Sequence, residues 1–120
     1  MDEVKLQVES SDAFWARAMA VARRIDAGDH TPEPASLSFP TLDGFLQFVT
    51  PERWHLLRTL RRHGNVSVHS LAMALERDEQ GVDADVAALL AVDLIVRDEA
   101  AHISVPWSKI SVVMDLGQAA

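Results

Sequence analysis

The chain has 120 residues, of which 48% are hydrophobic and 24% are charged. This composition is typical of a folded domain and is too apolar for a disordered chain. Its 11 basic and 18 acidic residues give a formal net charge of −7, which excludes nucleic-acid binding through overall charge alone. The absence of cysteine excludes disulfides, thiolate metal sites and cysteine nucleophiles. We expect a cytoplasmic protein, since no apolar run approaches the roughly 20 residues that span a bilayer.

The amino-terminal segment is predicted to form a strand and a helix. Apolar and polar residues alternate from residue 4 to residue 8, which predicts a short, half-exposed strand. Ser11 and Asp12 are the expected caps of a helix that ends at Gly28. Apolar residues recur at helical spacing along it, so this helix is expected to pack against its own domain or against a partner.

A linker over residues 28–36, which contains two prolines, indicates where the chain divides. We predict an amino-terminal arm over residues 1–35 and a main domain over residues 36–120. The main domain is expected to begin with a brief extended segment over residues 37–39 and a short helix after Thr41.

Three further helices are indicated by their capping residues. Thr50 precedes Pro51, and this pair favours a helix start because threonine caps free amides and proline lacks an amide that needs a partner. That helix is expected to end at Gly64. Ser67 is the expected cap of the second helix and Asp78 of the third, with a tight turn between them.

The remaining chain is predicted to be extended. Residues 94–97 and 103–105 flank an acidic turn, and residues 110–116 alternate as a last strand. Three helices followed by such a ribbon are typical of a winged helix-turn-helix, in which the third helix enters the major groove of DNA. The predicted fold class is therefore mainly α with a small β component (α+β).

Several stretches of the sequence resemble one family of small prokaryotic proteins. They are LDGFLQFVTPERWHLLRTL at residues 42–60, VSVHSLAMAL at residues 66–75, the Arg77 to Val86 spacing, and Val105–Pro106–Trp107. With these stretches the chain resembles MarR-like winged-helix proteins, which are described as transcriptional regulators and are often antitoxins of toxin–antitoxin pairs. The resemblance implies operator binding as a homodimer, autoregulation and neutralisation of a small basic toxin.

The candidate DNA-binding residues lie on the predicted second and third helices, on the helix before them and on the ribbon. They are Ser67, His69, Arg77, Gln80, Asp83, Ala84, Arg58, Arg61, Arg62 and Arg97. Residues 78–93 carry five acids and no Lys or Arg, which repels phosphate from the surface that normally reads DNA. A second interpretation is therefore a protein-interaction module whose acidic third helix binds a basic toxin. The arginines also fit an ordinary solvated helix face.

A second group of candidates concerns partner binding and dimerisation. Its members are Val4, Leu6, Val8, Phe14, Trp15, Met19, Ile110, Val112 and Met114. The strands over residues 4–8 and 110–116 are expected to pair with each other or with their copies in a second chain. Alternatively, one of them adds to the sheet edge of a small toxin.

We predict no enzymatic activity, cofactor or metal. The five histidines lack a pair at i, i+4 spacing. Ser67, His69 and Asp78 lack the nucleophile elbow and oxyanion turn of a hydrolytic triad, and no phosphate-binding glycine pattern is present.

Overall fold

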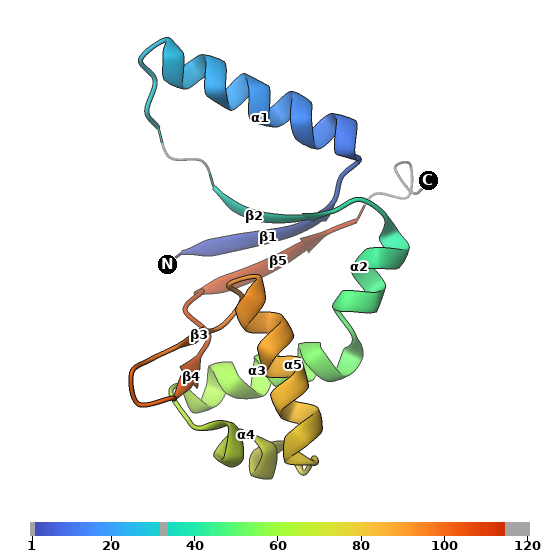
Figure 1. Ribbon diagram of the computed structural model, residues 1–120, viewed down its shortest axis with the longest axis vertical. Coiled ribbons are helices and arrows are strands. Elements are labelled where there is room, and N and C mark those ends of the chain that lie inside the picture. Colours follow the sequence, from blue (N-terminus) through green and yellow to red (C-terminus); the bar gives the residue numbers. More distant parts are fainter. Residues whose placement is uncertain (1, 32–33, 115–120) are drawn as a thin grey trace. The chain divides into compact units, whose positions relative to one another are not determined.

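A computed structural model describes residues 2–31 and 34–114 (Figure 1). Helices and two small sheets make up the chain, so the predicted α+β class is confirmed. The elements in chain order are β1 (Glu3–Val8), α1 (Ser11–Asp26), β2 (Ala35–Phe39), α2 (Leu42–Phe48), α3 (Pro51–His63), α4 (Val68–Leu75), α5 (Glu79–Ala91), β3 (Val96–Arg97), β4 (Ile103–Ser104) and β5 (Lys109–Val113). Within the described residues, no helix has the length and apolar character needed to cross a membrane.

The chain forms two compact units. The helical unit spans Val49–Trp107 and contains α3, α4, α5, β3 and β4. Among the described residues, the sheet unit consists of residues 2–31, 34–48 and 108–114. The predicted division after residue 35 lies inside the sheet unit, because β2 pairs with β1 there.

The sheet unit contains a three-stranded sheet in the order β2–β1–β5, with both pairs parallel. Leu6 of β1 is in register with Leu37 of β2 and Val112 of β5. The predicted alternation of β1 is confirmed, since Val4 and Leu6 are buried and Lys5 is exposed. The last strand ends at Val113, and the predicted residues 115 and 116 lie outside the described residues.

The two faces of this sheet differ in polarity, as expected from the period of two along each strand. One face carries the buried apolar residues of β1, and on this side Phe39 contacts Phe45 and Phe48 of α2 with ring centroids 5.3 and 5.6 Å apart. The opposite face carries charged, amide and hydroxyl side chains. Its members include Glu3, Lys5, Gln7, Glu9, Ser36, Ser38 and Ser111.

The helix α1 begins one residue earlier than its expected caps. Ser10 has an extended backbone, and its Oγ accepts a hydrogen bond from the amide of Ala13 at 3.1 Å, so Ser10 is the cap in place of Ser11 or Asp12. The helix ends before Gly28, whose φ of +93° favours glycine. None of the side chains of α1 is buried.

The helices of the helical unit begin at the residues predicted to cap them. The hydroxyl of Thr50 accepts from the amide of Arg53, and the hydroxyl of Ser67 accepts from the amide of Ser70. Asp78 does the same for the amide of Gly81 at the start of α5. These caps satisfy amides that have no partner inside the helix, which explains why the sequence located them.

The strands of the helical unit are short and pair with each other and with the segment between α3 and α4. β3 and β4 form an antiparallel hairpin, and Val66, between α3 and α4, exchanges backbone hydrogen bonds with Ile103 of β4. Of the predicted extended segment 94–97, only the last two residues form a strand, and Leu94 and Ile95 are buried instead. The core is built from apolar residues of all three helices and the hairpin: Leu56, Leu57, Leu60, Leu71, Ala72, Val82, Val86, Leu89, Leu94, Ile95, Ile103 and Val105.

Candidate nucleic-acid interface

The exposed side of α5 is acidic. Glu79, Gln80, Asp83 and Ala84 are exposed, whereas Val82, Val86 and Leu89 face the core. This division follows from the spacing of three and four residues between the buried positions. The predicted contact residues of α5 are thus accessible, and Gln80 is the one neutral side chain among them with an amide for base recognition.

The amino-terminal ends of α4 and α5 are connected by an exposed contact. Nδ1 of His69 lies 2.7 Å from Oε1 of Glu79, and both side chains are more than half exposed. The hydroxyl of Ser67 is engaged within α4, where it donates to Oγ of Ser70 at 3.1 Å and caps the helix. Ser67 is therefore partly exposed and engaged in the cap, while His69 is exposed and contacts Glu79.

Asp85 differs from the exposed acids Glu79 and Asp83 of α5, because it is paired with two arginines. Its Oδ1 accepts from Nε of Arg53 on α3 at 3.0 Å, and its Oδ2 accepts from Nη2 of Arg77 at 2.9 Å. Its side chain is 16% exposed. The two arginines come from separate parts of the chain, so Asp85 ties α3 and the α4–α5 turn to α5.

This contact also engages two arginines, one of which, Arg77, is among the candidate DNA-binding residues. Both side chains point to Asp85 and are only partly exposed, because pairing compensates the cost of burying a guanidinium. Nη1 of Arg77 is buried and has no hydrogen-bond partner within the described residues.

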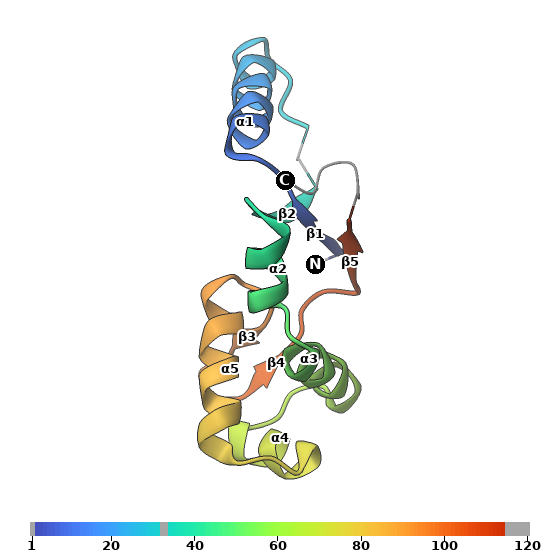
Figure 2. The same ribbon diagram turned by 90° about the vertical axis from the view of Figure 1, so that its right-hand side faces the viewer.

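The other candidate arginines are exposed. Arg58, Arg61 and Arg62 lie on α3, and Arg97 lies on β3. Figure 2 shows α3 and α5 on different sides of the β3–β4 hairpin. The basic residues of α3 therefore do not extend the exposed face of α5, and Arg97 on the hairpin is the candidate arginine outside α3 that remains exposed.

The hairpin turn is organised by Asp98. Its carboxylate accepts hydrogen bonds from the amides of Ala100 and His102, and from the side-chain amide of Asn65. The backbone donor at His102 and then Asn65 hold the pKa of Asp98 below its ordinary value. Asp98 therefore stays ionised at neutral pH and keeps negative charge at the tip of the hairpin, next to Glu99.

The predicted partner-binding residues fall into three groups that differ in exposure. Val4 and Leu6 are buried, and β1 has a strand on each side, so these residues serve the sheet of their own chain. Val8 and Ile110 are partly exposed on the same sheet. The exposed members lie on α1 and at the carboxyl end of the described chain: Phe14, Trp15, Met19, Val112 and Met114.

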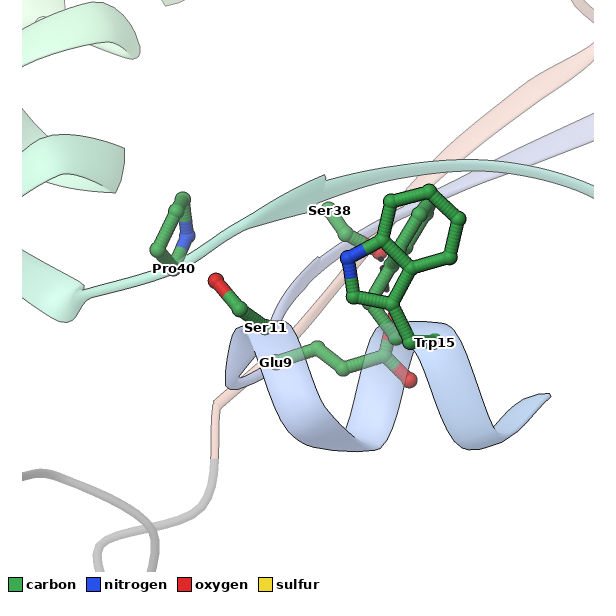
Figure 3. Close-up of a pocket in the computed structure, with 6 residues that line it drawn as sticks. Glu9, Ser11, Trp15, Ser38 and Pro40 are labelled. Carbon is green, nitrogen blue, oxygen red and sulfur yellow. Dashed lines mark hydrogen bonds between the residues drawn. The ribbon is translucent and has the colours of Figure 1, made fainter. Parts of the chain in front are cut away.

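A small cavity of about 220 Å³ lies beside the first turns of α1 (Figure 3). Glu9, Ser38 and Trp15 are among the residues that line it. Arg17 donates two hydrogen bonds to Glu9 at 3.0 and 3.1 Å, and the hydroxyl of Ser38 donates a third at 2.9 Å. The hydrogen bond from Arg17 is the main cause that lowers the pKa of Glu9. Sequence reasoning missed this contact, since Glu9 and Ser38 are distant in the chain.

Metal-binding groups of three or more His, Cys, Asp or Glu side chains do not occur within the described part of the chain. The carboxylates and histidines around α4 and α5 are instead engaged in caps, in the His69–Glu79 contact and in the Asp85 ion pairs.

The comparisons with known proteins identify the family of this region. Residues 48–112 match the protein family HVO_A0114, over more than half of the chain. The chain belongs to this family. The match contains the entire helical unit. No match was found among curated proteins or among solved structures.

Proposed function

We propose that the helical unit is a winged helix-turn-helix module that binds DNA and regulates transcription. In this proposal α4 and α5 are the helix-turn-helix, α5 enters the major groove, and the β3–β4 hairpin is the wing. The chain is not an enzyme in this proposal, and it acts in the cytoplasm through binding alone.

The observation that carries the proposal is the order and pairing of the elements. Three helices precede the hairpin, and Val66 between the first two helices pairs with Ile103 of the hairpin. This pairing holds the hairpin beside the helices, so that α5 and the proposed wing belong to one compact unit. The ion pairs of Asp85 support the same role, because they join α5 to α3 and to the turn between α4 and α5.

The charge of α5 limits how this module contacts DNA. Glu79 and Asp83 repel phosphates, while Gln80 and His69 offer hydrogen bonds to base edges or to the backbone. Arg97 on the hairpin supplies positive charge next to the acidic turn. We therefore expect weak binding to arbitrary DNA and a strong dependence on salt.

The test is binding of the purified chain to labelled DNA from its own promoter, measured by fluorescence anisotropy at about 50 and 200 mM salt. Arg97→Ala is expected to weaken binding several-fold and to reduce the salt slope by about one. Lys5→Ala, on the polar face of the sheet, removes the same charge and is the matched control. Absence of binding by the wild-type chain at about 50 mM salt would overturn the proposal.

A second function is favoured by one specific observation: the exposed side of α5 carries the acids Glu79 and Asp83 and no Lys or Arg. In this alternative the chain is an antitoxin-like interaction protein, and α5 binds a small basic protein through charge complementarity. Operator binding, autoregulation and toxin neutralisation can coexist in one protein. The two proposals therefore differ in whether the exposed side of α5 binds DNA or a basic protein.

The double variant Glu79→Gln/Asp83→Asn separates these functions, because it moves the two affinities in opposite directions. DNA affinity should rise several-fold when two repelling charges are removed. Affinity for a basic partner should fall instead. The measurements are DNA anisotropy and co-purification with the product of the neighbouring open reading frame. Retention of that product by the double variant at wild-type strength would exclude α5 as its binding surface.

A further inference from the structure

The helix α1 has an apolar face that its own chain covers only in part, where Phe14 and Trp15 line the cavity beside Ser38 and Pro40. Trp15 and Met19 are 64% and 56% exposed, and Phe14 and Ile25 are 40% and 48% exposed. These four residues, with Ala18 and Ala22 between them, lie within one side of the helix when 3.6 residues complete a turn. An exposed group of large apolar side chains on one face of a helix is often an interaction surface.

The sheet beneath α1 is unsuited to cover this face. Arg17 of α1 contacts Glu9 and, through it, Ser38, and both of these residues belong to the polar face of the sheet. The rest of that face consists of residues such as Lys5 and Gln7. Burying Trp15 against these groups would leave polar atoms without water or partners, which is unfavourable.

Other parts of the described chain offer less apolar surface than α1. The helical unit has one large exposed apolar side chain, Met73. In the sheet unit, α2 adds Leu46, and the end of β5 adds three residues from Val112 to Met114. The surface that best matches the apolar face of α1 in size is therefore the same face on a second copy.

We propose that a second copy of this chain docks on the apolar face of α1, with the two α1 helices antiparallel about a two-fold axis. Such an interface is isologous, because each copy offers the same patch. The proposal does not depend on DNA binding, since it rests on the sheet unit alone.

The area of the patch agrees with what a stable dimer needs. If each large side chain has an accessible area of about 200 Å², the four exposed fractions leave roughly 400 Å² of apolar surface on each copy. Two copies would bury roughly 800 Å², which at the usual apolar share of about 60% corresponds to an interface of about 1,300 Å². Specific interfaces begin at about 1,200 Å² of total buried surface.

The charges at the edge of the patch complement one another in the antiparallel arrangement. Asp12 and Arg23 flank the same edge of the apolar face at opposite ends of α1. A two-fold axis near the middle of the helix brings Asp12 of one copy beside Arg23 of the other. Asp26, the remaining acid at this face, then approaches the amino-terminal end of the second helix, where free amides favour a carboxylate.

The oligomeric state tests the proposal directly. The wild-type chain at about 50 μM should sediment with twice the mass of one chain, as expected for an interface of standard size. Trp15→Glu should raise the dissociation constant of the dimer by about 100-fold, because each interface loses two copies of a central aromatic side chain. Ala20→Glu adds the same charge on the opposite side of α1 and should leave the dimer intact.

Two outcomes would overturn the proposal. One is a wild-type chain that remains monomeric at about 50 μM, which would mean that α1 is covered within its own chain or by a different partner. The other is a dimer that Trp15→Glu does not weaken. Trp15 is exposed within the chain, so an unchanged circular dichroism spectrum should show that this variant folds.

The antiparallel arrangement is tested by exchanging charges at the edge. Asp12→Arg should weaken the dimer several-fold because it places two cations together, and Asp12→Arg/Arg23→Asp should restore wild-type affinity. Failure of the double variant to recover would rule out the antiparallel pairing of Asp12 with Arg23.

Discussion

The helices α1 and α5 have similar fractions of apolar residues, but only α5 buries apolar side chains within its own chain. α5 buries Val82, Val86 and Leu89 and is anchored by Asp85 to two arginines. α1 is longer, and none of its side chains is buried. An apolar stripe therefore predicts that a helix packs against another surface. It does not show whether that surface belongs to the same chain or to a partner.

The physical reason lies in what each helix meets. α5 faces other apolar helix surfaces and a hairpin, so its stripe is buried in a shared core. α1 approaches its own sheet on the polar side, where a salt bridge between Arg17 and Glu9 is the favourable contact. Substitutions in the two helices and in their ion pairs should therefore differ in their effect on stability.

Truncation of a core residue of α5 should destabilise the chain far more than the same change on α1. Leu89→Ala is expected to lower the free energy of unfolding by about 3 kcal/mol, because it removes buried methyl groups and leaves a cavity. Met19→Ala, at a concentration where the chain is monomeric, should change it by less than about 0.5 kcal/mol. Urea denaturation followed by circular dichroism measures both, and equal losses would contradict the contrast between the two helices.

Removal of the carboxylate of Asp85 should have the next largest effect. Asp85→Ala leaves Arg53 and Arg77 partly buried without their shared anion, and we expect a loss of about 2 kcal/mol in the free energy of unfolding. The control is Asp83→Ala on the exposed side of the same helix, which should change stability by less than about 0.5 kcal/mol. If both variants unfold at the same denaturant concentration, Asp85 is not a structural anchor.

The anchor of α1 should be weaker and dependent on pH. The hydrogen bond from Arg17 lowers the pKa of Glu9 in the folded chain, so this contact stabilises the fold above the unfolded pKa near 4.3. That stability is lost as the pH falls through the lowered, folded pKa. Arg17→Met should cost about 0.5 kcal/mol at pH 7, since Arg17 is partly exposed.

The cost of Arg17→Met should disappear at a pH below the lowered, folded pKa, where Glu9 is protonated in both states. Denaturation of wild type and variant at the two pH values provides the comparison. An NMR titration of the Glu9 carboxyl should also show a higher pKa in the variant. An effect of Arg17→Met that is independent of pH would indicate a packing role instead.

The smallest expected effect concerns the hairpin turn. Asn65→Ala removes one of the donors to the Asp98 carboxylate, so the pKa of Asp98 should rise toward its ordinary value. It should remain below that value, because the backbone donor at His102 is retained. NMR titration of Asp98 measures this shift, and an unchanged pKa would show that the Asn65 contact is not formed in solution.

Local signals in the sequence predicted much of the fold. The caps Thr50, Ser67 and Asp78 and the glycine that ends α3 were located correctly, because a cap depends on residues only a few positions apart. The alternation of β1 was correct for the same reason. The cap of α1 was misplaced by one residue, since Ser10 and Ser11 are chemically equivalent as caps and only the backbone distinguishes them.

The candidate site was predicted less completely. The exposure of Gln80, Asp83 and Ala84 followed from helical periodicity. The roles of Arg53, Arg77 and Asp85 did not, because a charged residue on a helix is usually solvated and the partners lie up to 32 positions apart. Only the packing of α3 against the α4–α5 region brings these side chains together.

The sequence by itself determined the helices, their caps, the acidity of α5 and the apolar stripe of α1, since each depends on residues within a few turns of one another. Only the tertiary structure decided that β1 lies between β2 and β5, that Asp85 is partly buried and paired with two arginines, and that α1 meets a polar sheet face. These are pairings between segments that are distant in the sequence. The free energy that stabilises them comes from desolvation and from side-chain contacts, which a pattern of neighbouring residues does not reveal.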